Sequence, residues 1–457
     1  MNYLLLFYMV ANLIVTAVGG TVPRNPSVRS DLLQPSQDPF YAVPDGLDAI
    51  KPGTILQHRA PPSPIAAFSV AALNLKASHQ ILYRTTDSLG AATATVLTVL
   101  MPHNADTSKI LSYQIAEDAA SINCAPSYAL QLKSATGPLL GTLVTQAELL
   151  LVEAALQQGW VVIIPDFQGS KGAYLANKLA GYATLDGIRA ALNSASFTGI
   201  MANSSNLKIG MWGYSGGSLA TNWAAELQPT YAPELRIAGA AVGGTIPNIT
   251  TALTTINGGP FTGFIPAGIL GLAAQYPEIQ QVLDQHLKPQ FVDKFHGVLN
   301  QCLVADAADF LFQDVIGMLD DRNLVQTNPI AVRVLGENAL GRATPKIPFF
   351  WYKSVLDEVS PVEDTDALVK KYCAQGVTIE YQRDLASEHG SCAVVGAPKA
   401  LSWLKNVMNG KNPQPGCSTK TVLTSLIDPA TVQVVPGYIV KLLLDLLGKP
   451  VGPLLFG

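Results

Sequence analysis

Apolar positions along the first half of the chain alternate between a period of two and a helical spacing. Residues 79–87 and 92–102 alternate apolar and polar side chains, as two neighbouring strands do, and residues 109–116 form another β-rich run. Residues 138–159 have helical spacing and end at a glycine. Residues 159–169 are a continuous apolar run closed by Pro and Gly, which is typical of a strand covered on both faces of a parallel sheet.

The second half repeats this alternation. Residues 184–195 have helical spacing, and residues 207–227 predict a strand, a glycine-rich turn and a helix. Residues 237–244 predict a short strand, and residues 347–361 and 377–390 predict two more, each ending in charged side chains. Such an alternation predicts the α/β class, with a mostly parallel sheet and helices on both faces.

Two stretches depart from the alternation. Residues 21 to about 65 are rich in proline and predict an extended arm over the surface rather than core. Residues 247–340 are helix-like and include a Gly/Pro segment, which predicts a cap inserted over the carboxyl edge of the sheet. We therefore expect a core in two parts, 21–246 and 341–457, with the cap between them. The apolar tail 434–457 could be a flap near the site, a membrane-surface helix or part of the core.

The composition excludes two function classes. Apolar residues make up 48% of the 457 residues and charged residues 14%, which excludes a disordered chain. The net charge of −4 provides no basic surface for binding nucleic acid. We therefore expect a folded protein with no nucleic-acid partner.

Residues 1–20 predict a secretory signal peptide, since the apolar run from Tyr3 to Val18 is short for a membrane span and is followed by small residues. An uncleaved anchor is the alternative. A secreted, extracellular chain without a stable membrane span is the expectation. The sequons at Asn203 and Asn248 are then candidate glycan acceptors.

Export also changes how the cysteines are interpreted. In an oxidising compartment five cysteines predict two disulfides and one remaining thiol, and their spacing does not resemble a zinc site. The spacing leaves the pairing open. The five are Cys124, Cys302, Cys373, Cys392 and Cys417.

The strongest chemical signal is the pentapeptide G-x-S-x-G formed by Gly213, Tyr214, Ser215, Gly216 and Gly217. A serine on a sharp strand-to-helix turn needs small residues two positions away on either side, so that the two backbones can pass. An apolar strand precedes this pentapeptide and a helical run follows it. This context predicts a nucleophilic Ser215 in an α/β-hydrolase, with the backbone N–H of Gly216 facing the oxyanion.

A serine hydroxyl needs a base, which is normally an imidazole. Of the six histidines, only His286, His296 and His389 follow Ser215, as the chain order of this fold requires. The first two lie on amphipathic runs of the cap, where a surface or packing role is expected. His389 follows a predicted strand in a polar loop with glycine, and we predict that it is the base.

The acid that orients the imidazole should lie at the end of the predicted strand before the one that leads to His389, which is the strand in residues 347–361. Asp357 is the first acid after that apolar strand and is the predicted partner. Glu358, Asp364 and Asp366 are alternatives, although they could instead lie at the N-terminus of the next helix.

A second oxyanion donor usually follows an earlier strand, and the chain has no HGGG-type motif there. Glu117 and Asp118 follow the 109–116 run instead. Their plain interpretation is a solvated loop, so the residues alone leave Asp118 as a minor candidate.

These motifs together resemble the fungal secretory lipases. The likeness rests on the segments DPFY, SYQIAEDAASINCAPSYAL, GWVVIIPDFQG, GYSGG, LDEVSP and EHGS, and covers most of the mature chain. It implies an α/β-hydrolase core with a helical lid inserted before the acid strand. It also implies a triad of Ser215, Asp357 and His389, with Asp118 beside Gly216 in the oxyanion hole.

The same resemblance implies a disulfide pairing and a substrate. Its disulfides would be Cys124–Cys302 and Cys373–Cys417, which leaves Cys392 as the odd thiol. The family's substrates are acylglycerols, with an acyl tunnel through the lid.

We therefore predict a secreted, monomeric serine lipase that acts on acylglycerols at an oil–water interface, through an acyl-enzyme and without metal or organic cofactor. The apolar side chains of the cap favour a lipid substrate. A carboxylesterase or acyltransferase with the same triad is one alternative. A non-catalytic lipid-binding protein on the same scaffold is the other.

Overall fold

The structure is a computed structural model that describes residues 32–67, 71–134, 143–425 and 449–453. The chain divides into two compact units, residues 1–31 and 32–457, and every described residue belongs to the second. The predicted signal peptide lies outside the described residues. The same is true of most of the apolar tail and of the start of the predicted 138–159 helix.

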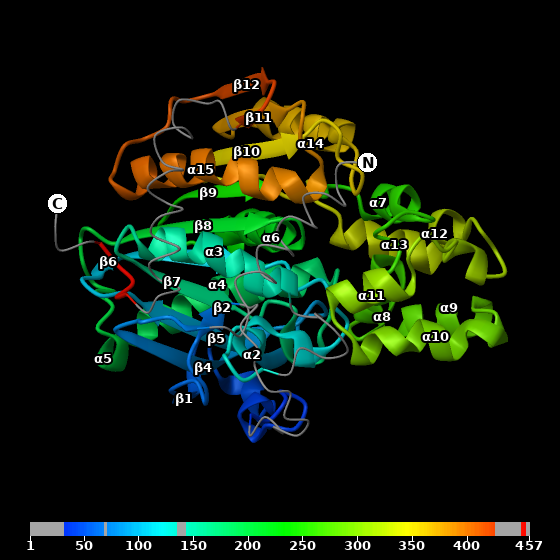
Figure 1. The fold of residues 1–457 in the computed structure, drawn as a ribbon, viewed down its shortest axis with the longest axis horizontal. Coiled ribbons are helices and arrows are strands. Elements are labelled where there is room, and N and C mark those ends of the chain that lie inside the picture. The colour runs from blue at the N-terminus through cyan, green and yellow to red at the C-terminus, as the bar shows by residue number, and fades with distance from the viewer. Residues whose placement is uncertain (1–31, 68–70, 135–142, 426–448, 454–457) are drawn as a thin grey trace, which may run out of the picture. The chain divides into compact units, whose positions relative to one another are not determined.

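Ten strands form one sheet in the order β1-β4-β5-β7-β6-β8-β9-β10-β11-β12 (Figure 1). The pairs from β7 to β12 are parallel, and β1, β4, β5 and β7 pair antiparallel. The predicted α/β class and its mostly parallel sheet are thus confirmed. The sheet strands are β1 Ile55–Arg59, β4 Ala77–Thr86, β5 Ala92–Met101, β6 Asp106–Gln114, β7 Trp160–Pro165, β8 Lys208–Tyr214, β9 Ile237–Gly243, β10 Phe349–Ser354, β11 Ile379–Asp384 and β12 Cys417–Val422, and Ala66–Ala67 (β2) pairs separately with Ala71–Ala72 (β3).

Helices cover both faces of the sheet, because its central strands are apolar on both sides. Every residue of β7 is buried. One apolar cluster packs Leu185 of α4 and Leu219 of α6 against the sheet, and a second packs Leu149 of α3 and Leu404 of α15. The helices outside the cap are α2 Pro126–Ala129, α3 Leu143–Leu156, α4 Asn177–Asn193, α5 Ala195–Thr198, α6 Gly216–Tyr231, α14 Val362–Ala374 and α15 His389–Met408.

Only helices and loops connect β9 to β10, with no strand of the sheet between them. Figure 1 shows these helices gathered beside the sheet. Their bounds are α7 Ile249–Ile256, α8 Phe264–Ala273, α9 Pro277–His286, α10 Val292–His296, α11 Leu303–Asp309, α12 Leu324–Thr327 and α13 Pro329–Asn338. They belong to the same compact unit as the sheet, so the limits 247–340 for a separate cap stay a prediction.

The described part of the proline-rich arm is not a simple surface strap. Phe40 and Tyr41 form a 3-10 turn, η1 (Pro39–Tyr41), and both are buried against Leu82 and Val96 of the sheet. The guanidinium of Arg59 lies 4.0 Å from the ring centroid of Phe40. The prediction that this arm contributes nothing to the core was wrong, because two isolated aromatic residues carry no periodic signal.

Strand β12 was not predicted either. Its sequence CSTKTV is polar and mostly exposed, and it pairs with β11 at the edge of the sheet. Among the described helices, none combines the length and the apolar character needed to span a bilayer.

Candidate active site

Ser215 lies on a sharp turn between β8 and α6. Its backbone has φ 51° and ψ −121°, which is an unusual conformation for a residue with a side chain. A β-carbon on Gly213 would lie 2.2 Å from the carbonyl oxygen of Gly217, and one on Gly217 would lie 1.9 Å from that of Gln114. The two glycines are therefore required by the close approach of three backbone segments, as the pentapeptide predicts.

The structure brings His389 to Ser215, since Nε2 of the imidazole lies 2.8 Å from the serine Oγ. Two further contacts fix the histidine backbone. Its N–H donates to Oε2 of Glu358 at 2.8 Å, and its carbonyl accepts from the Tyr214 hydroxyl at 2.5 Å. The histidine is thus held from two different segments of the chain, one at Tyr214 and Ser215 and the other at Glu358.

His389 is the first residue of helix α15 rather than part of a loop, so the predicted loop was wrong. Glu388 caps the helix by accepting from the backbone of Ser391, whose hydroxyl accepts from the Glu388 N–H at 2.9 Å. This capping box satisfies backbone donors at the helix start and sets the direction in which the His389 side chain leaves the helix.

Asp357 completes the constellation. Its Oδ2 lies 2.8 Å from Nδ1 of His389, and its Oδ1 accepts from the backbone N–H groups of Val359 and Ser360 at 2.9 and 2.8 Å. Lys353 Nζ lies 2.8 Å from the same Oδ2. Burial alone raises the pKa of Asp357, but His389 and Lys353 together hold that pKa well below its ordinary value. The carboxylate is therefore ionised beside the imidazole.

The three alternative acids have other partners. Glu358 accepts from the backbone of His389 and not from its ring. Asp364 lies in the first turn of α14, and Asp366 accepts from the Tyr381 hydroxyl at 2.9 Å. Among the described contacts, Asp357 is the acid that reaches the imidazole.

The two cap histidines also have partners of their own. Nδ1 of His286 lies 2.8 Å from Oδ1 of Asp320, and Nδ1 of His296 lies 2.9 Å from the carbonyl of Val292. Both histidines are partly exposed, in keeping with the predicted surface role. The cap approaches the site through Phe261, whose ring centroid lies 6.4 Å from that of His389.

Glu117 and Asp118 are each 2% exposed, so the interpretation as a solvated loop was wrong. Asp118 has a positive φ of 44°, and its Oδ1 is buried without a hydrogen-bond partner. That oxygen lies next to Gly216, where the second oxyanion group is expected. Burial raises the pKa of Asp118 to about 7, against a smaller opposing effect of His389.

The backbone N–H of Asp118 is already used. The side-chain amide of Gln168 fits with its oxygen 3.1 Å from this N–H and its nitrogen 2.7 Å from the carbonyl of Ala119. The free hydrogen-bonding group of Asp118 is therefore its carboxyl and not its backbone.

Comparison with known proteins decides the family. The model of the secretory lipase family matches residues 131–416. Lipase A of Arthroderma benhamiae is 49% identical over 423 residues, which cover 92% of this chain and 90% of that protein. The chain belongs to the secretory lipase family. Lipase 2 of Candida albicans is 36% identical over 92% of this chain and 90% of that protein.

A solved structure agrees with this assignment. Candida antarctica lipase A in its closed state is 32% identical and superposes with a TM-score of 0.80, covering 92% of this chain and 99% of that one. The expected resemblance is thus confirmed, and this secretory lipase is an ester-hydrolysing enzyme with the α/β-hydrolase fold.

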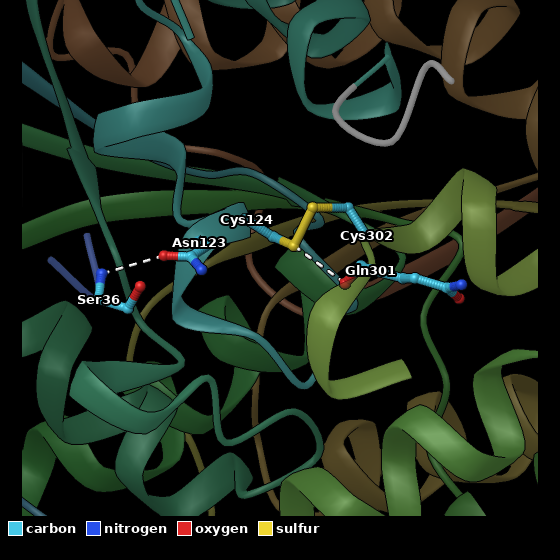
Figure 2. Close-up of a disulfide and its surroundings, with 5 residues drawn as sticks. All are labelled: Ser36, Asn123, Cys124, Gln301 and Cys302. Carbon is cyan, nitrogen blue, oxygen red and sulfur yellow. Dashed lines mark hydrogen bonds between the residues drawn. A yellow bond between two sulfur atoms is a disulfide. The ribbon is translucent and has the colours of Figure 1, made fainter. Parts of the chain in front are cut away.

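In this secretory lipase one disulfide joins the loop after β6 to the cap. Cys124 in the 3-10 turn η3 (Ile122–Cys124) is bonded to Cys302, the residue before α11 (Figure 2). The neighbouring Asn123 accepts a hydrogen bond from the backbone of Ser36 at 3.0 Å, so the same turn also holds the N-terminal arm.

The other cysteines are placed as the resemblance implies. Cys373 at the end of α14 is bonded to Cys417 at the start of β12, and Cys392 in α15 is a buried thiol. Burial raises the pKa of the Cys392 thiol to about 12. Two disulfides and the name of the family are consistent with secretion.

Both sequons lie at the surface. Asn203 is exposed in the loop before β8, and Asn248 is exposed at the N-terminus of α7, where its side chain accepts from the Thr251 N–H at 3.3 Å. Their glycosylation stays a prediction. Within the described ranges, no three His, Cys, Asp or Glu side chains cluster in a way that could hold a metal ion.

Lys353 is the site residue that we did not predict from the sequence. A signal was present, because it is the single charged residue in the apolar run IPFFWYKSV. A lysine at such a position must find a buried partner, and the first acid along the chain is Asp357.

Proposed function

We propose that the chain is a secreted triacylglycerol lipase, which cleaves acylglycerol esters by two-step acyl transfer at Ser215. The observation that carries this proposal is the 2.8 Å contact between the Ser215 Oγ and Nε2 of His389, in a member of the secretory lipase family. A hydroxyl and a base at this distance can exchange a proton while the hydroxyl oxygen attacks a carbonyl carbon.

In the first step the Ser215 Oγ forms a bond to the ester carbonyl carbon, and its proton passes to Nε2 of His389. Asp357 accepts the other ring N–H, which keeps the imidazole in the required tautomer and stabilises the imidazolium. The imidazolium then gives its proton to the alkoxy oxygen of the leaving alcohol as the ester C–O bond breaks. The acyl group remains on Ser215.

In the second step water attacks the acyl-enzyme. His389 takes a proton from that water, the bond to the Ser215 Oγ breaks, and the serine recovers its proton as the fatty acid leaves. The reaction balances with one ester and one water consumed for each alcohol and acid released.

The oxyanion of both steps is bound by the N–H of Gly216 and by the carboxyl of Asp118. Gly216 is the first residue of α6, where the helix N-terminus favours negative charge. The Asp118 carboxyl can donate a hydrogen bond only while it is protonated. Its raised pKa, about 7, supports a protonated group in mildly acidic solution.

The apolar character of the cap supports a fatty acyl substrate, and a small apolar cavity lies inside the cap. Aliphatic side chains of α7, α8, α9, α12 and α13 line it, among them Leu253, Ile269 and Leu335. None of the lining residues belongs to the proposed triad, so the cavity reflects the apolar interior of the cap. A single chain acting at an oil–water interface is the form that we propose.

Substitution of Ser215 tests the proposal. Ser215→Ala should lose hydrolysis by about a million-fold. The matched control is Ser196→Ala, because Ser196 is an exposed serine of α5 and its loss should leave hydrolysis unchanged. Normal turnover by a folded Ser215→Ala protein would contradict the proposal. A rate that rises sharply above the solubility limit of the ester favours a lipase, and one that saturates below that limit favours a carboxylesterase.

Secretion is tested separately. We infer cleavage of the signal peptide near Gly19 or Gly20, so N-terminal sequencing of protein from the medium should start close to residue 20. Removal of N-linked glycans should increase the gel mobility of that protein. The increase should be smaller in Asn203→Gln and in Asn248→Gln, because each variant lacks one acceptor.

A further inference from the structure

The side chain of Lys353 is 1% exposed, although lysine is rarely buried without a specific partner. It comes from β10, four residues before Asp357. Its Nζ lies 2.8 Å from Oδ2 of Asp357 and donates to the carbonyl of Thr245 at 3.0 Å. The lysine thus lies directly behind the acid of the proposed triad.

We propose that Lys353 is a positioning residue that fixes Asp357 and keeps His389 available as a base in acidic solution. This inference rests on the proposed function, since it concerns the same three residues. It goes beyond that function by assigning a fourth residue, which acts through Asp357 without touching the substrate.

The positions of the donors support the positioning role. Oδ1 of Asp357 accepts two backbone N–H groups, and Oδ2 accepts both Lys353 and the ring of His389. Three of these four donors are present whether or not the imidazole is in place. The carboxylate therefore has one orientation before the histidine docks against it, and little reorganisation is needed during the reaction.

The charges support the effect on pH dependence. When His389 takes a proton, the imidazolium and the Lys353 ammonium contact the same oxygen of one carboxylate. Two cations then share one anion, which makes the imidazolium less favourable than it would be beside Asp357 alone.

The other charged groups near Lys353 do not replace this effect. Arg383 is its register neighbour on β11 and pairs with Asp366 of α14 at 3.5 Å. Asp364 of α14 also interacts with Lys353: burial raises the pKa of Asp364, and Lys353 is among the groups that lower it. Within the described residues, Asp357 is the carboxylate at ion-pair distance from Lys353.

Besides Asp118, which interacts with His389, Glu358 is the remaining acid beside the histidine. Its carboxylate accepts from the backbone N–H of His389, so its charge acts on the ring equally in the parent and in Lys353 variants. A change in pH dependence on replacing Lys353 can therefore be assigned to the lysine.

The test is the pH–rate profile of Lys353→Met between pH 4 and 9 on a soluble ester. The acid limb of kcat/KM should move upward by about one pH unit, so that activity at pH 5 falls about tenfold relative to that at pH 8. KM should be unchanged, because Lys353 does not touch the substrate. Lys353→Arg retains the charge and should retain the parent limb.

Arg189→Met is the control for loss of a partly buried, ion-paired cation away from the site. Arg189 pairs with Asp186 at 2.8 Å on α4, and the Asp186 side chain is fully buried. This variant should lose thermal stability without moving the acid limb. An unchanged limb in a folded Lys353→Met protein would overturn the inference.

A second variant keeps the test possible if Lys353→Met does not fold. Lys353→Gln keeps a donor for Asp357 and removes the charge, so it should show the same shift. If neither variant folds, Lys353 serves stability and the inference is overturned as well. The proposed function is tested independently by Ser215→Ala, because a parent limb in Lys353→Met refutes only the role of the lysine.

Discussion

A β-carbon placed on Gly216 would lie 1.8 Å from Oδ1 of Asp118. The carboxyl of Asp118 thus occupies the space that any side chain at position 216 would need, directly beside the first turn of α6. A residue in a left-handed conformation, with φ 44°, holds it there. This placement explains why the turn requires glycine on the far side of the serine as well as before it.

The first prediction concerns the alkaline limb of the reaction. Burial raises the pKa of Asp118 to about 7, so below pH 7 the carboxyl is protonated and can donate to the oxyanion. Above pH 7 it ionises and repels the oxyanion, and kcat should fall. Asp118→Asn keeps a donor that does not titrate in this range, so its kcat should stay level up to pH 9.

The matched comparison is Asp118→Ala, which removes the donor at every pH. It should lose about 100- to 1,000-fold in kcat across the whole profile. Stopped assays on a soluble ester at constant ionic strength measure both variants. A decline near pH 7 that is identical in the parent and in Asp118→Asn would contradict the assignment of this carboxyl.

The second prediction concerns stability. Asp306 in α11 is fully buried with neither carboxyl oxygen bonded, and burial raises its pKa to about 8, with a smaller effect of Asp309. Between pH 4 and 8 the folded state therefore holds a proton that the unfolded state has lost, and this contribution to stability falls as the pH rises. Asp306→Asn should raise Tm at pH 8 by about 2 °C or more, with little change at pH 4.

Asp293→Asn is the control for that measurement, since Asp293 is an exposed carboxylate of the same cap. Its Tm should follow the parent at both pH values. Scanning calorimetry at pH 4, 6 and 8 would contradict the prediction if Asp306→Asn differed from the parent by the same amount throughout.

The third prediction concerns the disulfide between Cys124 and Cys302. The bond closes 178 residues and ties the cap to the turn after β6 (Figure 2). The double substitution to serine should lower the free energy of unfolding by about 2–5 kcal/mol, because the unfolded chain regains the freedom that the crosslink removes. Denaturant titration at neutral pH measures the loss.

The second disulfide provides the comparison. Cys373 and Cys417 join α14 to the edge strand β12, and both elements lie outside the cap. Replacing both cysteines with serine should lower the free energy of unfolding. The ratio between activity on an emulsified ester and activity on a soluble ester should stay at the parent value. If loss of the Cys124–Cys302 bond leaves stability unaltered, the tether is not a stabilising feature.

The central strands and the serine turn could be predicted because both are encoded locally. Continuous apolar runs predict central strands such as β7 and β8, and G-x-S-x-G needs glycine for steric reasons at the turn itself. Chain order then selected Asp357 and His389 from a small set, and the structure places both within hydrogen-bond distance of each other.

Features that depend on tertiary packing could not be predicted in the same way. The burial of Asp118 involves segments distant in sequence, the turn at Gly216 and the loop at Gln168, whereas its local sequence predicts a solvated loop. The helix that starts at His389 could not be predicted because Gly390 and Pro398 are poor helix formers. Packing against the sheet stabilises the helix in spite of these two residues. The polar edge strand β12 is stabilised by its ladder with β11 and not by an apolar face.

The central claim is that Ser215 is the nucleophile, and covalent labelling tests it most directly. The protein is treated with a fluorophosphonate ester, its intact mass is measured, and the modified peptide is mapped, with His389→Ala treated in parallel. We predict one adduct per chain on Ser215, formed far more slowly in His389→Ala. An adduct on another residue, or equal labelling of the two proteins, would contradict the account.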